Sequence, residues 1–183
     1  MTCIIGFVEK DNGIVYVGGD SAGVTGLDVC IREDPKVFLV QNKFIIGYTT
    51  SFRMGQLLHF SFNPPDQKKD QTDYEYMCTN FINEAMKCFD AGKFGPEHEK
   101  EKRGGSFLVG YKGNLYHIES DFQVGILKDP FWSVGCGAHF ALGALYATSG
   151  LKMPTEKRIT LALQTAVKFS GGVRPPFVIL HLP

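Results

Sequence analysis

The sequence predicts an α+β fold of four layers, an αββα sandwich in which two antiparallel sheets pack face to face between pairs of helices. The expected elements follow the order strands, two helices, strands, two helices, strand. Helices that come in pairs, instead of alternating with single strands, argue against a doubly wound parallel sheet. Tight-turn sequences at 11–13 and 112–114 join neighbouring strands into hairpins. Each sheet then buries one face on the other sheet and one on helices.

The first fifty residues read as consecutive short strands. Strands are expected at 2–8, 14–17, 35–40 and 43–48, with a further short strand near 28–32. The first two strands flank Asp11-Asn12-Gly13, and an Asn-Gly pair between apolar runs is a strong hairpin signal. Turn-forming residues fill the loop 21–33, and Gln41-Asn42 forms the next turn.

Two helices are expected next. Ser51 can cap a helix that runs to about residue 60 and stops before Asn63-Pro64-Pro65. A second helix covers 73–89, where apolar residues recur every three or four positions. The segment 90–105 carries charges of both signs and reads as a solvated loop.

Strands return in the second half of the chain, before a second pair of helices. The strands are expected at 106–111, 115–120 and 123–126, followed by a short apolar segment at 131–134 and a last strand at 176–182. A helix rich in small residues follows at 138–148. Thr155 is expected to cap the fourth helix, at 156–169, which ends at Gly171-Gly172.

Composition bounds the class of protein. The 183 residues are 44% hydrophobic with zero net charge, which suits one globular domain spanning 1–183 and gives no footprint for nucleic acid. No apolar run is long enough for a transmembrane helix, and no secretory signal is expected. The five scattered cysteines form no C-x-x-C pair, so we expect no zinc site and no disulfide framework. They read as buried apolar thiols in a reducing cytoplasm, with a catalytic cysteine as the alternative.

No cofactor or metal site is expected. The segment Gly135-Cys136-Gly137-Ala138 resembles the start of a dinucleotide fingerprint, but it lacks the third glycine and no βαβ unit surrounds it. The five histidines show no metal-binding spacing.

The strongest chemical candidate is Thr2. If Met1 is removed, Thr2 carries a free α-amine beside its own hydroxyl, which places a base and a nucleophile in one residue. The hairpin at 11–13 brings Asp20 opposite positions 2 to 5, so a carboxylate is expected close to Thr2. From spacing alone, the alternative readings are an ordinary first strand, a turn residue at Asp20 and a surface lysine at Lys36.

Four local motifs occur in one order along the chain. They are Thr2 before an apolar strand, Gly18-Gly19-Asp20-Ser21-Ala22, Lys36-Val37-Phe38, and Val134-Gly135-Cys136-Gly137-Ala138 before a helix of small residues. Together with length and element order, they resemble the proteasome β-subunit family of N-terminal nucleophile (Ntn) hydrolases, and most of all its bacterial HslV branch.

The resemblance implies a role for each motif. Thr2 would be the nucleophile, Lys36 the cation that favours its deprotonated hydroxyl, and Asp20 the partner that orients Lys36. The backbone N–H of Thr49 would stabilise the oxyanion, with Thr50 as the alternative donor. Cys136 and Gly137 would lie beside the nucleophile.

Three departures from the family pattern point to slower, altered or lost activity. Thr49-Thr50 stands where the family has small residues, and Cys136 stands where the family has a serine. Lys168 aligns with an aspartate of the family.

The resemblance therefore implies a threonine-type endopeptidase subunit of the cytoplasm. It would cleave polypeptides inside stacked homo-oligomeric rings, with a ring ATPase unfoldase as partner and without cofactor, nucleic acid or membrane. Two alternatives remain open: a catalytically silent ring or scaffold protein, and an Ntn amidohydrolase that acts on a small amide.

Overall fold

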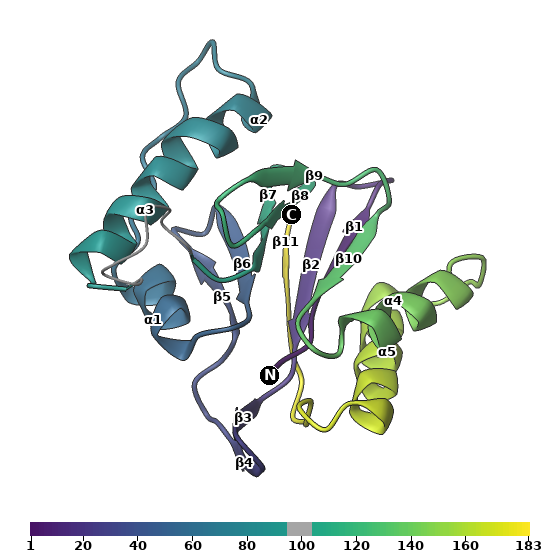
Figure 1. Cartoon of the computed structure of the whole chain (residues 1–183). Helices are drawn as coiled ribbons and strands as arrows, with labels where there is room; N and C mark the ends of the chain where they lie inside the picture. The colour runs from purple at the N-terminus through teal and green to yellow at the C-terminus, as the bar shows by residue number, and fades with distance from the viewer. Residues whose placement is uncertain (95–103) are drawn as a thin grey trace.

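The computed structural model describes residues 1–94 and 104–183 and confirms the four-layer αββα prediction (Figure 1). Within these residues, one sheet has the strand order β10-β1-β2-β11 and the other β5-β6-β7-β8-β9, and every strand pair is antiparallel. The four-stranded sheet comprises β1 (Ile4–Glu9), β2 (Ile14–Gly19), β10 (Phe131–Val134) and β11 (Val178–Leu182). The five-stranded sheet comprises β5 (Val37–Val40), β6 (Phe44–Tyr48), β7 (Phe107–Tyr111), β8 (Asn114–Ile118) and β9 (Val124–Ile126).

Helices cover the outer face of each sheet (Figure 1). The five-stranded sheet carries α1 (Phe52–Phe60), α2 (Asp73–Tyr76), the π-helical turn η1 (Met77–Phe81) and α3 (Ile82–Ala91). The four-stranded sheet carries α4 (Ala138–Ala147) and α5 (Thr155–Phe169). The centre of the predicted loop 90–105 lies outside the described residues.

Three apolar clusters fill the spaces between the four layers. Strand β1 shows how one strand serves two of them, because its side chains alternate between faces. Ile4 packs between the sheets with Val17 and Val37, whereas Ile5 packs outward with Leu163 of α5. Burial on both faces explains why the strand begins as an uninterrupted apolar run.

The register of the first hairpin places the residues around Thr2. Ile4 pairs with Gly19 and Ile5 with Gly18, so Asp20 comes next to Cys3. The Asp20 backbone N–H donates to the Cys3 carbonyl at 3.3 Å. The predicted position of Asp20, opposite positions 2 to 5, is confirmed.

Several predicted details differ from the structure. Part of the loop 21–33 is a hairpin of β3 (Ala22–Thr25) and β4 (Asp28–Ile31), which projects from the body of the fold (Figure 1). The helix predicted at 73–89 contains the π-helical turn. There the Thr79 hydroxyl donates to the Glu75 carbonyl at 2.6 Å, and the Ile82 N–H donates to the Met77 carbonyl five residues back.

One helix cap is confirmed and one is wrong. The Ser51 hydroxyl accepts the Met54 N–H and caps α1. Thr155 is instead the first residue inside α5, and its hydroxyl donates to the Glu9 carboxylate on β1. That hydrogen bond lowers the pKa of Glu9 and ties the start of α5 to the four-stranded sheet.

The expectation of buried thiols holds for two cysteines and is wrong for three. Cys3 and Cys88 are buried, whereas Cys30, Cys78 and Cys136 are exposed.

Candidate active site

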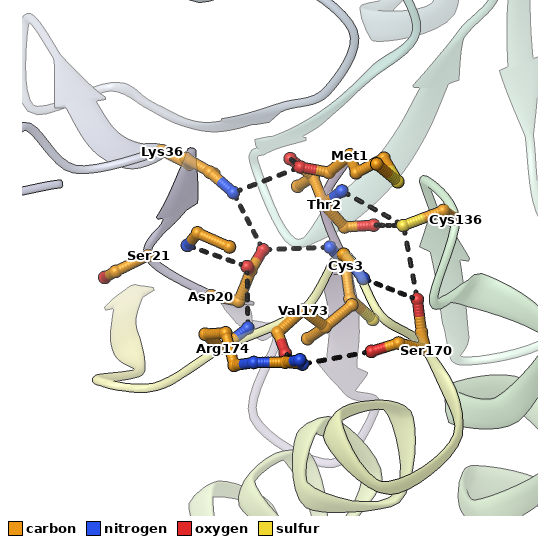
Figure 2. Close-up of polar contacts among 12 residues, drawn as sticks. Met1, Thr2, Cys3, Asp20, Ser21, Lys36, Cys136, Ser170, Val173 and Arg174 are labelled. Atoms are coloured by element: carbon orange, nitrogen blue, oxygen red, sulfur yellow. Dashed lines mark hydrogen bonds and ion pairs between the residues drawn. The ribbon is translucent and has the colours of Figure 1, made fainter. Parts of the chain in front are cut away.

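An ion pair between Asp20 and Lys36 lies behind the N-terminus (Figure 2). Asp20 directly follows β2 and Lys36 directly precedes β5, so the two sheets each contribute one charge. The Lys36 Nζ lies 3.0 Å from Asp20 Oδ1, and neither side chain is more than 1% exposed. The surface reading of Lys36 is therefore wrong.

Asp20 also accepts three backbone N–H groups. Its Oδ1 accepts the Cys3 N–H at 3.0 Å, and its Oδ2 accepts the N–H groups of Ala22 at 2.9 Å and Arg174 at 3.2 Å (Figure 2). A buried carboxylate is tolerated only where hydrogen bonds and an opposite charge replace its lost water. The carboxylate therefore joins the residue before β1, the start of β3 and the segment after α5 at one point.

Burial lowers the pKa of Lys36 below its ordinary value of 10.5, although the Asp20 carboxylate opposes that shift. The Nζ also lies 3.5 Å from the Met1 carbonyl oxygen and 5.7 Å from the centre of the Phe52 ring. The pKa of a lysine shifts readily on burial, and lysines with a lowered pKa are common at catalytic sites.

Thr2 is 4% exposed, and its hydroxyl donates to the Met1 carbonyl at 2.5 Å. The Lys36 ammonium and the Thr2 hydroxyl thus converge on one carbonyl oxygen. With Met1 attached, the Thr2 nitrogen is an amide, which is not a base. The residues that the sequence predicts around Thr2 lie together, and a free amine at Thr2 would require the bond before Thr2 to be cut.

The other side of Thr2 faces the turn between β10 and α4. Cys136 Sγ accepts the Thr2 N–H at 3.3 Å and donates to the Thr2 carbonyl at 3.5 Å. It also lies 3.4 Å from the Ser170 hydroxyl, and the Gly137 N–H donates to the Thr2 carbonyl at 3.2 Å. These contacts hold the backbone of Thr2 from the side opposite Lys36 (Figure 2).

Gly135 makes the close approach of this turn to Thr2 possible. Its φ is +99°, a conformation that side chains disfavour, and a Cβ there would lie 2.3 Å from the Thr2 carbonyl oxygen. The third nearest atom to that Cβ would be Thr49 Cγ2, at 3.3 Å, so Thr49 borders the same space.

The two candidate oxyanion donors differ in their hydrogen bonds. The Thr49 N–H and hydroxyl both donate to the Ser106 carbonyl, at 3.1 and 2.9 Å. Thr50 has a φ of +71°, and its N–H has no acceptor within residues 1–94 and 104–183. Because an oxyanion donor has to be free to bind the oxyanion, Thr50 fits the role better than Thr49.

The structure thus brings Thr2, Asp20, Lys36, Cys136 and Gly137 together around the chain's N-terminus, with Thr49 and Thr50 nearby. Lys168 is exposed in the last turn of α5. Sequence reasoning missed the contributions of Ser170 and Arg174, which follow that helix. Their one signal was the predicted helix end at Gly171-Gly172, which returns the chain to the site.

The described residues contain neither a metal-binding cluster nor a membrane-spanning helix. In the described part of the chain, no group of three or more His, Cys, Asp and Glu side chains is arranged to hold a metal ion. Among the same residues, no helix combines the length and apolar character needed to cross a bilayer.

Comparison with known proteins shows the fold. No protein-family model matches the sequence, and no curated protein matches it significantly. Among solved structures, Thiobacillus denitrificans BPH in complex with epoxomicin superposes with a TM-score of 0.78 at 17% identity, covering 98% of this chain and 99% of that chain. Eukaryotic HslV from Trypanosoma brucei has a TM-score of 0.69 at 16% identity and covers 98% of both chains.

Anbu, the ancestral beta-subunit from Yersinia bercovieri, has a TM-score of 0.66 at 11% identity over 100% of this chain and 82% of that chain. At sequence identities of 11–17%, a structural match shows the fold and not the function. The chain has the proteasome-like fold of the Ntn type that its four sequence motifs predict.

Proposed function

We propose that this chain is a threonine-type peptidase subunit, one domain spanning 1–183, whose nucleophile is Thr2 after removal of Met1. The observation that carries the proposal is the convergence of the Lys36 ammonium and the Thr2 hydroxyl on the Met1 carbonyl oxygen, at 3.5 and 2.5 Å. A cation that shares an oxygen with the hydroxyl is near enough to favour its deprotonated form.

In the mechanism, the freed α-amine of Thr2 takes the proton from the Thr2 hydroxyl, and Oγ1 attacks the carbonyl carbon of a substrate peptide bond. The amine then passes that proton to the leaving amine, and the acyl group stays on Oγ1 as an ester. Water hydrolyses this ester and restores the hydroxyl. Lys36 supplies positive charge during attack, and Asp20 keeps Lys36 in position.

The free Thr50 N–H would donate a hydrogen bond to the oxyanion. Thr49 would hold the loop that carries Thr50 in place through its two hydrogen bonds to the Ser106 carbonyl. Cys136 would hold the Thr2 amine by the contact that its Sγ makes with the same nitrogen. A thiol is a weak hydrogen-bond donor and acceptor, so this side of the amine would be held loosely.

The proposal extends to the assembly. Homo-oligomeric stacked rings in the cytoplasm, polypeptide substrates and a ring ATPase unfoldase are the arrangement that the family resemblance implies. The fold shared with BPH, HslV and Anbu supports a ring-forming subunit.

A contact of Cys136 favours a second candidate, a ring subunit without activity. The Cys136 thiol, which stands where the family has a serine, lies 3.3 Å from the Thr2 nitrogen and is a weak hydrogen-bond partner for it. A chain that keeps Met1 has no terminal amine at Thr2 and would serve only as scaffold. A small-amide hydrolase would use the same mature Thr2.

Intact mass and inhibitor sensitivity together test the proposal. We expect the purified protein to lack the Met1 mass, to cleave unfolded polypeptides, and to be inhibited by epoxomicin, the compound in complex with the BPH structure. Thr2→Ala should abolish cleavage, while Thr2→Ser should retain it in part. Full activity in Thr2→Ala would refute the mechanism, retention of Met1 would favour the scaffold, and turnover of small amides alone would favour the amidohydrolase.

A further inference from the structure

A second hydroxyl group outside the contacts of Thr2 is paired with a histidine and an acid. Ser106 directly precedes β7, His117 lies in β8 and Glu119 directly follows β8. The Ser106 Oγ lies 2.9 Å from His117 Nε2, and His117 Nδ1 lies 3.1 Å from Glu119 Oε1. A hydroxyl, an imidazole and a carboxylate in this order, each within hydrogen-bond reach, are the parts of a nucleophile, its base and the group that orients the base.

Sheet geometry holds the three side chains in line. The register pairs Leu108 with His117, so Ser106 lies diagonally across from His117, and Glu119 lies two residues further along the same strand direction. Residues two apart share a face of a strand. Leu108 packs between the sheets, so all three side chains belong to the inner face of the five-stranded sheet.

The charge state suits proton transfer. Burial lowers the pKa of His117, and the Glu119 carboxylate opposes that shift. The His117 side chain is 12% exposed, whereas the Glu119 side chain is 44% exposed. When Nδ1 donates its hydrogen to Glu119, Nε2 is left as the acceptor for the Ser106 hydroxyl.

An unpaired donor lies beside this group. The Trp132 ring centre is 6.1 Å from that of His117, and the buried Trp132 Nε1 has no hydrogen-bond partner among the residues that the structure describes. Buried donors in native proteins are nearly always paired, so an indole N–H without an acceptor calls for a reason.

We propose that Ser106, His117 and Glu119 form a second nucleophilic centre that accepts the acyl group of a small activated ester, independently of Thr2. Oγ of Ser106 bonds to the ester carbonyl carbon as its proton passes to His117 Nε2. The carbon–oxygen bond to the alcohol then breaks, and the alcohol leaves with that proton. Water, deprotonated by the same Nε2, hydrolyses the acyl-serine and returns the proton to Ser106.

A fluorophosphonate probe tests the centre because it reacts with activated serines: Oγ bonds to phosphorus, fluoride leaves and His117 takes the proton. Incubation of the full chain followed by peptide mass mapping should place one adduct on Ser106. Ser106→Ala should abolish this adduct and His117→Gln should slow its formation about 10²–10⁴-fold, the usual contribution of a general base. Glu119→Gln should slow it less, since the imidazole is only misoriented.

Matched controls separate this centre from its surroundings. Ser120→Ala removes an exposed serine from the turn after β8 and should leave labelling of Ser106 unchanged, as should Thr2→Ala. Thermal unfolding of each variant shows whether it is folded. Absence of the Ser106 adduct in the wild type, or equal labelling rates in a folded His117→Gln variant, would overturn the proposal whether or not Thr2 is active.

Discussion

The two sides of Thr2 are held by different chemistry. On one side, Asp20 and Lys36 are buried charges joined at 3.0 Å, and the carboxylate also accepts three backbone N–H groups. On the other, an exposed cysteine touches Thr2 through contacts of 3.3 and 3.5 Å. Removing either Asp20 or Lys36 leaves a buried charge without its partner. Replacing the exposed Cys136 by a residue of similar size should cost little stability. On only one side, therefore, do the residues that stabilise the fold coincide with those of the proposed mechanism.

The largest expected effect comes from Lys36→Ala. This change leaves Asp20 buried without its counter-charge, and breaking a buried pair in this way costs about 3–5 kcal/mol of unfolding free energy. Under the proposed mechanism, peptidase activity should fall about 10²–10³-fold with loss of the positive charge that favours the deprotonated hydroxyl. Denaturant unfolding and peptide turnover measure the two losses.

A double replacement sharpens that result. In Lys36→Met with Asp20→Asn, both charges are absent and the amide oxygen still accepts backbone N–H groups, so part of the stability should return although activity does not. If Lys36→Ala unfolds at the wild-type denaturant midpoint, the ion pair does not carry the stability assigned to it.

The next prediction compares the reactivity of two thiols near Thr2: Cys3, just before β1, and Cys136, in the turn between β10 and α4. Burial raises the pKa of Cys3 to about 12, while Cys136 is exposed. Because the thiolate is the reactive form, we expect maleimide to modify Cys136 at least about 10²-fold faster than Cys3. Peptide mapping over time gives both rates, and early modification of Cys3 would mean that the N-terminal strand opens readily.

The pH profile tests the charge on Lys36. Burial lowers the pKa of Lys36 below 10.5, so the ammonium is lost as pH rises through that lowered value. Activity that requires the ammonium should therefore fall, about tenfold per pH unit, on an alkaline limb below the usual lysine pKa. The measurement is kcat/KM against pH.

Lys36→Arg is the control, since a guanidinium stays protonated throughout the range. Its residual activity should show no such limb. An unchanged limb in Lys36→Arg would assign the titration to a group other than Lys36.

The smallest effect is expected at Cys136. Cys136→Ser replaces a weak donor by a stronger one at the same position, so activity should rise by a few-fold with stability unchanged within about 0.5 kcal/mol. Cys136→Ala should lower activity by a similar factor. A loss as large as that of Lys36→Ala would show that the two sides are equivalent.

The sequence predicted the parts of the site that depend on local pairing. Asp20 was placed beside the first strand by a single tight turn, and Ser51 was recognised as a cap by its position before an apolar stretch. Arg174 could not be found in this way, because its N–H meets an Asp20 oxygen across 154 positions of the chain. Contacts of that kind depend on how layers pack, which no local pattern encodes.

The Ser106–His117 pair shows a different limit. The turn was expected to contain Lys112, Gly113 and Asn114, whereas the structure pairs Tyr111 with Asn114 around a turn of Lys112 and Gly113. A one-residue change of register moves every side chain to the opposite face of a strand. The expected turn therefore could not show which side chains of the hairpin meet.

Gly135 limits which residues can stand beside Thr2. The space next to the Thr2 carbonyl exists because glycine has no Cβ, and even one methyl group would lie 2.3 Å from that oxygen. A side chain at this position would press on Thr2 from the turn between β10 and α4, toward the side on which Lys36 lies (Figure 2). Position 135 therefore accepts a side chain only if Thr2 moves, so a change here would be read out at the candidate nucleophile.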